Sequence, residues 1–260
     1  MTVSSESDLC DSKAFFSIEE LSLLDPDKVP GHVAIIMDGN RRWAKQKNLL
    51  PMIGHWEGAD ALTQVVRAAS ELGIKTVTVF AFSTENWARP HPEIDALMKI
   101  FELYLVREKE SMIRDGVRLN AIGKLAELPS QVQHALEETK AATKQCNKIN
   151  LVLALNYGGR DEIRRAVVKI FEMNEKNKIA PEDLTEELIG KQLDTSPWGD
   201  PDLLIRTSGE LRVSNFLLWQ ISYAEIYVTD VLWPDFSPQE LFGAVLAFQR
   251  RRRRLGGGII

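Results

Sequence analysis

Six short apolar runs, rich in Val, Ile, Leu and Ala, recur along this chain and are separated by segments with helical periodicity. Near-continuous apolar runs of this length are typical of strands that are covered on both faces of a sheet. The runs predict strands at His32–Met37, Lys75–Phe82, Val117–Gly123, Asn150–Asn156, Asp202–Ile205 and Glu225–Thr229. Strands of this kind need helices against them, which favours the α/β class.

The segments between the strands predict the helices. Apolar residues recur at three- and four-residue spacing within 62–69, 94–105, 132–136 and 163–170. Pro181–Gln192 and Pro238–Arg250 are expected to be helices opened by Pro or Ser-Pro. Alternating strands and helices imply right-handed crossovers. The sequence therefore predicts one α/β domain with a mainly parallel six-stranded sheet flanked by helices.

Composition excludes several classes of function. The formal net charge of −5 gives no support for nucleic-acid binding, so an anion site must come from local arginines. No apolar run approaches the roughly 20 residues of a membrane span, which leaves at most peripheral membrane contact. Cys10 and Cys146 are far apart and form no CxxC, so a reducing compartment is expected.

Residues 1–28 are polar and acidic, and we expect a flexible segment there, followed by the folded domain 29–260. The segment lacks the basic start and apolar stretch of a secretory signal. Its acidic residues also exclude an intact transit peptide, although one could already have been removed.

Polar clusters follow four of the predicted strands. In an open parallel sheet, ligands bind beyond the carboxyl ends of the strands. The clusters are Asp38–Trp43, Ser83–Arg89, Asn156–Arg160 and Arg206–Asn215. Their content of Arg, Asn, Ser and Asp predicts an anion site at this edge of the sheet.

The first cluster places a carboxylate, a glycine and two arginines at the start of a helix. Gly39 permits a tight turn, and the new helix presents unpaired N–H groups to an anion. Arg41 and Arg42 can bind phosphate oxygens. Asp38 can hold Mg²⁺, which prefers one or two carboxylates plus substrate phosphates. The alternative is that Asp38 merely caps the helix.

The later clusters allow the same two interpretations. Ser83 and Glu85 could form a capping box rather than contact a ligand. Arg206 and Arg212, together with Ser214, suit one diphosphate, but they could also form surface salt bridges. His55 follows Gly54 at a helix start and is an open candidate for phosphate contact.

Other phosphate and metal motifs are missing from the sequence. It contains no GxxxxGK[ST] and no GxGxxG, which argues against a P-loop NTPase or a dinucleotide fold. The four histidines do not pair at zinc spacing. Glu225, at the start of the sixth strand, either faces solvent or binds a metal.

At these residues the chain resembles the cis-prenyltransferase family, which is undecaprenyl diphosphate synthase-like. The resemblance lies in HVAIIMDGNRRWA (His32–Ala44), FAFSTENWARP (residues 80–90) and residues 202–236, and extends from about Pro30 to Gly257. It implies a Mg²⁺-dependent enzyme that condenses isopentenyl diphosphate with an allylic diphosphate. The product would be a Z-prenyl or Z-polyprenyl diphosphate, with diphosphate released.

The resemblance also implies roles for individual residues. Asp38 and Asn86 would be catalytic, with Asn86 acting at proton removal, and Asp38 and Glu225 would hold Mg²⁺. The allylic diphosphate would be bound by Gly39, Asn40, Arg41, Arg42, His55 and Arg89. The substrate site would be lined by Trp43, Ser83, Thr84, Glu85 and Trp87. Isopentenyl diphosphate would be bound by Arg206, Arg212, Val213 and Ser214.

A hydrophobic tunnel for the growing product is implied as well. Met98, Phe101 and Leu105 would line it, or they belong to the plain core. Ala81 is small and would keep the tunnel open, whereas Tyr104 is bulky and could block it. A medium-chain product is favoured and a short one stays open. Pro51 stands where many family members carry an arginine that aids the first diphosphate.

Partners and location complete the expectations. The family's terminal Arg-x-Gly, here Arg254-Leu255-Gly256, implies a homodimer in which each tail completes the partner's site, although an arginine-rich helix end is the plainer interpretation. Arg41 and Ser208 replace glycines as in plant members, which favours the plastid stroma; the alternative is the cytoplasm. Two alternatives to the enzyme are a non-catalytic subunit of a heteromeric prenyltransferase and an unrelated phosphatase.

Overall fold

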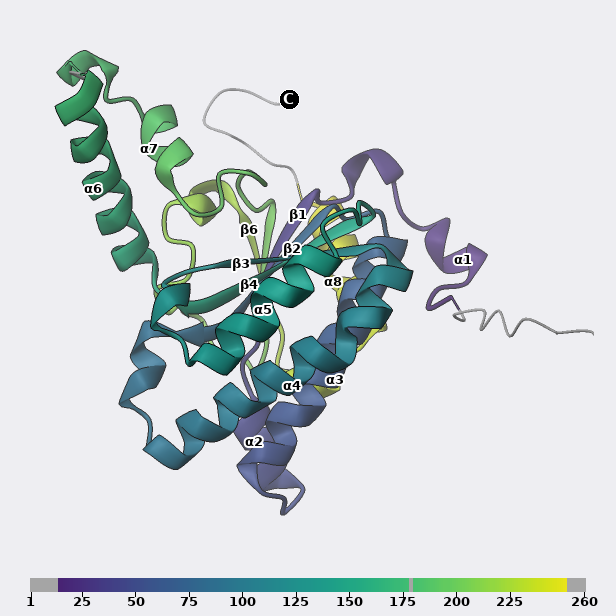
Figure 1. The fold of residues 1–260 in the computed structure, drawn as a ribbon. Coiled ribbons are helices and arrows are strands. Elements are labelled where there is room, and N and C mark those ends of the chain that lie inside the picture. The colour runs from purple at the N-terminus through teal and green to yellow at the C-terminus, as the bar shows by residue number, and fades with distance from the viewer. Residues whose placement is uncertain (1–13, 178–179, 252–260) are drawn as a thin grey trace, which may run out of the picture.

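The computed structural model describes residues 14–177 and 180–251, and helices surround one twisted sheet (Figure 1). The six strands are β1 (His32–Ile36), β2 (Thr76–Ser83), β3 (Val117–Ile122), β4 (Ile149–Tyr157), β5 (Leu203–Arg206) and β6 (Glu225–Val228). Their order in the sheet is β3-β4-β2-β1-β5-β6, and all five pairings are parallel. The predicted parallel α/β sheet is confirmed.

The helices are α1 (Ile18–Leu21), α2 (Asn40–Gln46), α3 (Pro51–Glu71), α4 (His91–Asp115), α5 (Ser130–Ala142), α6 (Gly159–Asn177), α7 (Glu186–Gln192) and α8 (Pro238–Gln249). One predicted helix is wrong in extent. Pro181–Asp183 forms a separate 3₁₀ turn, and α7 begins only after Thr185, whose hydroxyl accepts from the Leu188 N–H. Proline starts either kind of helix, but the threonine cap fixes where the α-helix begins.

Two hydrophobic clusters cover the two faces of the sheet. On β1, Val33 and Ile35 face the larger cluster, which packs the sheet against α3, α4, α5 and α8. Ala34 and Ile36 face the other cluster, which the segment around Phe216 covers. Successive residues of a strand point to opposite faces, so a strand buried on both sides must be apolar throughout.

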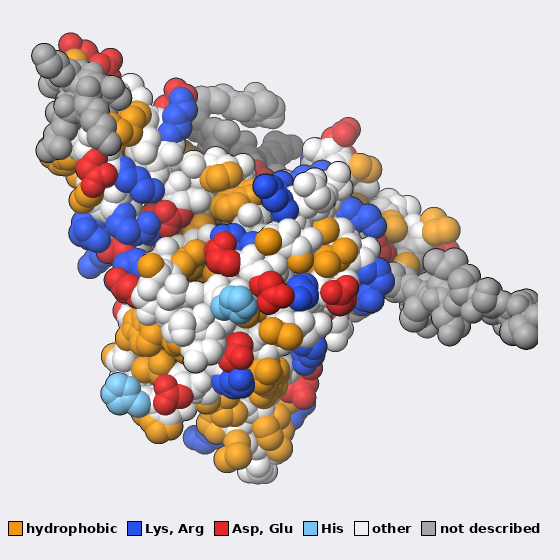
Figure 2. Space-filling view, in the orientation of Figure 1, with side chains coloured by type: hydrophobic (Ala, Val, Ile, Leu, Met, Phe, Trp, Pro, Cys, Tyr) orange, Lys and Arg blue, Asp and Glu red, His pale blue; other side chains and the backbone are white. Residues whose placement is uncertain are grey.

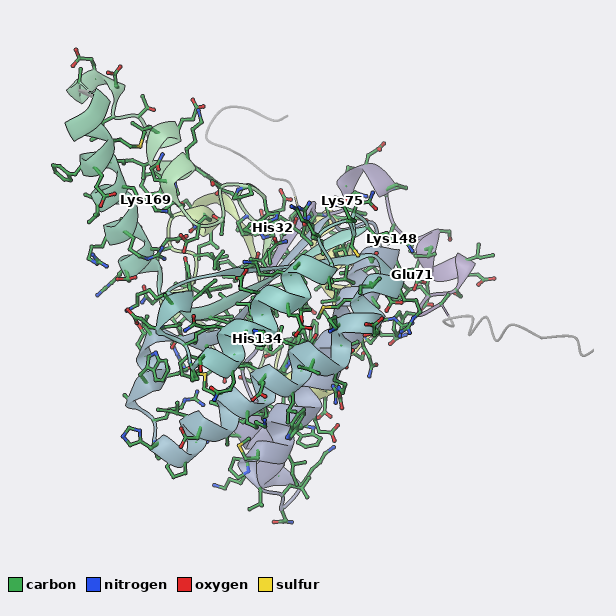
Figure 3. All side chains as sticks on the ribbon, viewed as in Figure 1. His32, Glu71, Lys75, His134, Lys148 and Lys169 are labelled. Atoms are coloured by element: carbon green, nitrogen blue, oxygen red, sulfur yellow. The ribbon has the colours of Figure 1, made fainter. Side chains whose placement is uncertain are left out.

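The segment before β1 is attached to the domain where the structure describes it. Phe16 is buried and its ring stacks on Phe242 of α8. The backbone N–H groups of Phe15 and Phe16 donate to the carboxylate of Glu71, which ends α3 (Figure 3). The division at residue 28 stays a prediction.

The surface agrees with the modest net charge. Acidic and basic side chains are interspersed on the face shown in Figure 2. Among the described residues, no helix combines the length and apolar character needed to cross a bilayer.

Candidate functional site

The register of the sheet brings three strand ends to one edge. Ile36 at the end of β1 pairs with Phe80 of β2 on one side and with Arg206, the last residue of β5, on the other. The segments that follow these strands therefore meet, as the sequence predicted, although residues far apart in the chain supply them.

Asp38 occupies the centre of this edge. Its Oδ2 accepts from Arg206 Nη2 at 2.9 Å, and its Oδ1 lies 3.5 Å from Arg42 Nη2. Thr207 fixes the backbone of Asp38: the threonine hydroxyl accepts from the Asp38 N–H at 2.9 Å and donates to its carbonyl at 2.6 Å. Asp38 does not cap the next helix, because Gly39 is the N-cap and no side chain caps that end.

Gly39 makes the turn between β1 and α2. Its φ of +112° is unfavourable for residues with a side chain. A Cβ there would also lie 3.1 Å from the Leu232 Cα atom. Space and backbone conformation together require glycine at this position.

Arg42 points across the turn to the loop after β5. Its guanidinium donates to the carbonyl and hydroxyl of Ser208 and lies 3.4 Å from Glu210 Oε1. Ser208 has a φ of +72°, a conformation that glycine adopts at less cost. Arg42, Ser208 and Glu210 thus connect the first predicted cluster to the last.

Arg206 is a buried cation at this edge, with only 4% of its surface exposed. Besides Asp38, it binds Ser214 Oγ at 2.9 Å and the carbonyl of Arg212. The surface salt-bridge alternative is therefore wrong for Arg206. The alternative fits Arg212, which is exposed and pairs with Glu210. Val213, which follows Arg212, is partly buried.

The segment after β2 turns back on itself. Asn86 Oδ1 accepts from the Ser83 N–H at 3.1 Å, so the capping partner of Ser83 is Asn86 and not Glu85. This bond occupies the amide oxygen of Asn86 and leaves its NH₂ group for a ligand. Thr84 packs against Gly158, where a Cβ would lie 2.7 Å from the threonine Oγ1.

Glu85 and Trp87 contact two other segments at the same edge. Asn215 Nδ2 donates to Glu85 Oε1 at 2.8 Å. Burial raises the pKa of the Glu85 carboxyl, but the hydrogen bonds from Asn215 and its neighbours outweigh that effect and lower it. Trp87 Nε1 donates to Asn156 Oδ1 at 2.8 Å, which ties this segment to the end of β4.

Arg89 and His55 mark one end of a cavity. Arg89 Nη1 pairs with Glu93 Oε1 at 2.9 Å, and Arg41 lies 3.7 Å from the same oxygen. Burial, aided by the charge of Arg89, lowers the pKa of His55 to about 4, so its ring is neutral at pH 7. Its buried Nε2, like Asn40 Oδ1, has no hydrogen-bond partner among the described residues.

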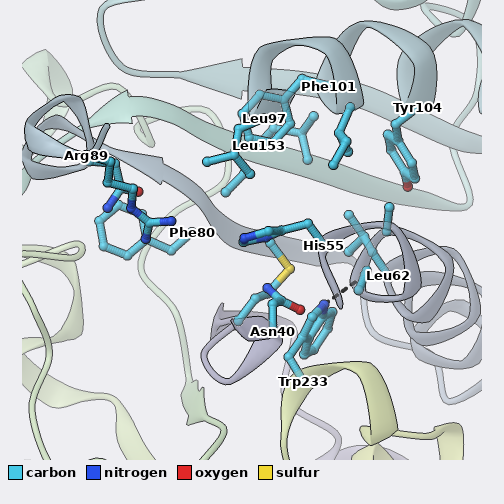
Figure 4. Close-up of a pocket in the computed structure, with 16 residues that line it drawn as sticks. Asn40, His55, Leu62, Phe80, Arg89, Leu97, Phe101, Tyr104, Leu153 and Trp233 are labelled. Atoms are coloured by element: carbon cyan, nitrogen blue, oxygen red, sulfur yellow. Dashed lines mark hydrogen bonds between the residues drawn. The ribbon is translucent and has the colours of Figure 1, made fainter. Parts of the chain in front are cut away.

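The cavity has a volume of about 140 Å³ and runs between α3, α4 and the sheet (Figure 4). Its polar end is formed by Asn40, His55, Asn86 and Arg89, and the rest of its wall is largely apolar. Ala81, Phe101 and Tyr104 line it as expected. Met98 and Leu105 instead belong to the buried core.

Trp43 and Glu225 lie elsewhere. Trp43 is buried on α2, and its Nε1 donates to Asp235 at 2.7 Å. Glu225 pairs with Leu203 at the start of β5, whereas Asp38 contacts Arg206 at its end. Leu203 and Arg206 are three residues apart on β5, so the position of Glu225 and that of Asp38 differ by about 10 Å along the strand.

A magnesium site formed by Asp38 and Glu225 of one chain is therefore inconsistent with this fold. Glu225 pairs instead with Arg251 at 2.7 Å. Within 14–177 and 180–251, no three acidic, His or Cys side chains gather as a metal cage. The carboxylate of Asp38, which lies among arginines, fits a Mg²⁺ ion that substrate phosphates also coordinate.

Three residues of the site received no individual role from the sequence, although Thr207 and Asn156 lie within the predicted clusters. Thr207 holds the Asp38 backbone, Glu93 pairs with two arginines, and Asn156 anchors Trp87. Asn156 was visible as the polar end of an apolar strand. Glu93 lies four positions after Arg89, the spacing of an ion pair on a helix, whereas nothing in the sequence relates it to Arg41.

Comparisons with known proteins agree with this geometry. A family model described as "Putative undecaprenyl diphosphate synthase" matches residues 36–256. An isoprenyl transferase of Geobacillus kaustophilus is 48% identical over 229 residues, which cover 88% of this chain and 89% of the relative. An isoprenyl transferase of Prochlorococcus marinus is 45% identical over 234 residues, which cover 90% of this chain and 86% of that relative.

Two solved structures share the fold. Lavandulyl diphosphate synthase from Lavandula x intermedia, in complex with dimethylallyl diphosphate, superposes with a TM-score of 0.86 at 36% identity, covering 89% of this chain and 100% of that one. A probable undecaprenyl diphosphate synthase from Campylobacter jejuni superposes with a TM-score of 0.74 at 35% identity, covering 88% of this chain and 99% of that one.

Proposed function

The chain belongs to the undecaprenyl diphosphate synthase family of cis-prenyltransferases, and from that premise we propose how its site binds two diphosphates and Mg²⁺. The observation that carries the proposal is the contact between Asp38 and Arg206 beside the polar end of an apolar cavity. The carboxylate of Asp38 thus lies between Arg206 on one side and Arg42 on the other.

The allylic diphosphate would lie at the start of α2. Arg41, Arg42 and Arg89 supply cations there, and the neutral ring of His55 offers a hydrogen bond from the cavity wall. The prenyl tail would extend into the apolar part of the cavity, where each buried CH₂ contributes about 0.8 kcal/mol.

Isopentenyl diphosphate would be held on the other side of Asp38. Arg206 and Ser214 are already joined at 2.9 Å, and Arg212 is exposed nearby on the same loop. Arg206 is fixed by its burial, so it can orient a diphosphate with little loss of entropy on binding.

The reaction needs a leaving group and a nucleophile in register. The allylic C–O bond breaks, the double bond of isopentenyl diphosphate attacks the allylic carbon, and a proton is lost. Arginine side chains stabilise the charge on the departing diphosphate. Mg²⁺, when bound by Asp38, would neutralise further charge on the same oxygens. The proton would pass to the departing diphosphate, which the free NH₂ group of Asn86 would help to orient as a hydrogen-bond donor.

The direct test supplies purified protein with Mg²⁺, labelled isopentenyl diphosphate and allylic primers of five, ten, fifteen or twenty carbons. Z-prenyl products that disappear with EDTA and return with added Mg²⁺ are expected. Products that persist in EDTA would overturn the metal proposal alone. No incorporation with any primer would favour the alternative of a non-catalytic subunit.

A homodimer is also proposed. Arg254-Leu255-Gly256 lies outside the described residues, but Arg251, shortly before it, is anchored to Glu225 on the edge strand β6. The proposal rests on the resemblance of that tripeptide to the family's terminal Arg-x-Gly. Light scattering should give twice the 29.4 kDa chain mass. An active monomer would overturn the proposal.

The plant-type and plastid expectations have no support among the curated relatives named above, which are bacterial.

A further inference from the structure

Asn215, in the loop that follows β5, forms hydrogen bonds with two other segments of the site. Its Oδ1 accepts from the Arg160 N–H at 2.9 Å, and its backbone carbonyl accepts from the Gly159 N–H at 2.7 Å. Its Nδ2 donates to Glu85 Oε1 at 2.8 Å. Asn215 therefore connects the loop after β5 both to the start of α6 and to the segment after β2.

The start of α6 needs the two acceptors that Asn215 provides. The first N–H groups of an α-helix have no partner within the helix. Gly159 and Arg160 are the first two residues of α6, which begins beside the sheet and extends away from it (Figure 1). Because Asn215 accepts from both N–H groups, the loop after β5 is fixed to the chain that follows β4.

The neighbours of Asn215 leave it little room to move. A Cβ on Gly158 would lie 2.8 Å from Asn215 Nδ2, and a Cβ on Gly159 would lie 3.1 Å from the Asn215 carbonyl oxygen. The next residue, Phe216, is fully buried, and its ring stacks on Phe80 with 4.5 Å between centroids. The close approach thus depends on two glycines before α6 and on a buried ring after Asn215.

The backbone at this point is in an unfavourable conformation. Ser214 and Asn215 have φ angles of +47° and +64°, in the left-handed region that residues with a side chain rarely adopt. Asparagine is among the residues that tolerate this region, whereas serine is not. Such a conformation persists only where surrounding contacts hold it. The three hydrogen bonds of Asn215 are contacts of this kind.

The backbone conformation of Ser214 decides where its hydroxyl points. Arg206 Nη1 donates to Ser214 Oγ at 2.9 Å, and the two side chains belong to the proposed site of isopentenyl diphosphate. The Cα–Cβ bond turns with the backbone, so a return of Ser214 to a relaxed conformation would move the hydroxyl away from Arg206. A diphosphate would then meet one fixed donor instead of two.

We propose that Asn215 is a positioning residue for isopentenyl diphosphate, because it holds the Ser214 hydroxyl beside Arg206. The inference rests on the proposed function. The partners of Asn215 also fix the orientation of its amide, since a backbone N–H only donates and the Glu85 carboxylate only accepts. A residue at this position therefore needs one acceptor and one donor.

Asn215→Asp removes the donor with little change in shape. Aspartate keeps an oxygen for the Arg160 N–H, but its second oxygen would face the Glu85 carboxylate and repel it. KM for isopentenyl diphosphate should rise roughly tenfold, and KM for the allylic primer should change by less than about twofold. Asn215→Gly permits the left-handed backbone but lacks the amide, and it should raise the same KM.

Glu85→Gln provides the rescue. In Asn215→Asp/Glu85→Gln the glutamine amide can donate to the new aspartate, so the hydrogen bond is reversed and the repulsion disappears. The double variant is compared with Glu85→Gln alone, which removes any separate effect of position 85. In that background Asn215→Asp should raise KM for isopentenyl diphosphate by less than about threefold.

Asn48→Asp is the matched control. Asn48 also has a left-handed backbone, with a φ of +55°, but it is exposed between α2 and α3. Asn48→Asp changes the net charge as Asn215→Asp does and should leave both KM values unchanged. A purely structural role of Asn215 would lower the melting temperature of Asn215→Asp and leave its KM values at the wild-type level, which would overturn the proposal.

Two other results would overturn it as well: equal increases of KM for both substrates, or an equal effect of Asn215→Asp with glutamate and with glutamine at position 85. If Asn215→Asp does not fold, Asn215→Gly decides, and a wild-type KM in that variant contradicts the role of the amide. A wild type that turns over no substrate would refute the proposed function. The Kd of isopentenyl diphosphate from calorimetry then replaces KM, and an unchanged Kd in Asn215→Asp would overturn the inference.

Discussion

Asp38 and Arg206, 168 positions apart in the chain, form an ion pair of 2.9 Å that joins the two proposed diphosphate subsites. Arg206 is almost fully buried, so its charge needs this partner in the absence of a substrate. When a diphosphate binds, its oxygens can take over part of that role and release the carboxylate for a metal ion.

Asp38→Ala should lower kcat by roughly 100- to 1,000-fold, because the carboxylate is the sole proposed metal ligand of this chain. The chain should still fold, with unfolding easier by about 1–3 kcal/mol because Arg206 loses its partner. Steady-state kinetics and chemical denaturation measure the two effects. Asp38→Asn, which keeps an oxygen acceptor for Arg206, is the control: it should lose turnover with a smaller loss of stability. Near-normal turnover in either variant would refute the metal role.

Arg212→Ala should raise KM for isopentenyl diphosphate by about tenfold or more, because a charge-assisted contact is lost. KM for the allylic primer should change much less. Arg118, an exposed arginine on β3, provides the matched control, and Arg118→Ala should leave both constants unchanged. Equal increases for both substrates in Arg212→Ala would contradict the division into subsites.

Thr207→Val should lower kcat by roughly 10- to 100-fold while changing KM little, because the hydroxyl fixes the Asp38 backbone. Valine has nearly the same shape, so the loss of stability should stay at about 1–2 kcal/mol. Thr207→Ser keeps the hydroxyl and should restore most of the turnover. If serine fails as valine does, packing rather than hydrogen bonding is the role of Thr207.

The stability of the protein should fall as the pH drops from about 6.5 to about 4, in part because of His55. Burial lowers its folded pKa to about 4, so the unfolded chain binds the proton first. Between these two pKa values, each such group changes the free energy of unfolding by about 1.4 kcal/mol per pH unit. In His55→Gln the free energy of unfolding should depend less steeply on pH. Parallel curves for the two proteins would show that His55 titrates normally.

Much of the fold was predictable because its strands are buried on both faces. Such strands appear as apolar runs, and every predicted strand end lies within one residue of the observed end. Helix periodicity was less informative. The apolar stripe of α4 includes Met98, Phe101 and Leu105, but only Phe101 lines the cavity, since α4 also packs on α3 and α5.

The sequence identified most charged residues of the site, but it did not reveal which of them contact one another. Strand ends pointed to Asp38, Arg206 and Asn86, and parallel pairing brought them together. The same pairing excludes Glu225 from Asp38, because Glu225 begins its strand whereas Arg206 ends the neighbouring one. Whether two residues of neighbouring strands lie close together depends on the register of those strands. The sequence alone does not reveal that register.

The central position of β1 has a consequence during synthesis of the chain. β1 lies between β2 and β5, and its residue Ile36 pairs with Arg206, which the ribosome adds about 170 residues later. At about 5–20 residues per second, that edge of β1 stays unpaired for roughly 10–30 s. An unpaired apolar strand edge can pair with other chains, so we expect nascent chains to need chaperone protection until β5 emerges. Because Arg206 ends β5, the proposed diphosphate site is complete only then.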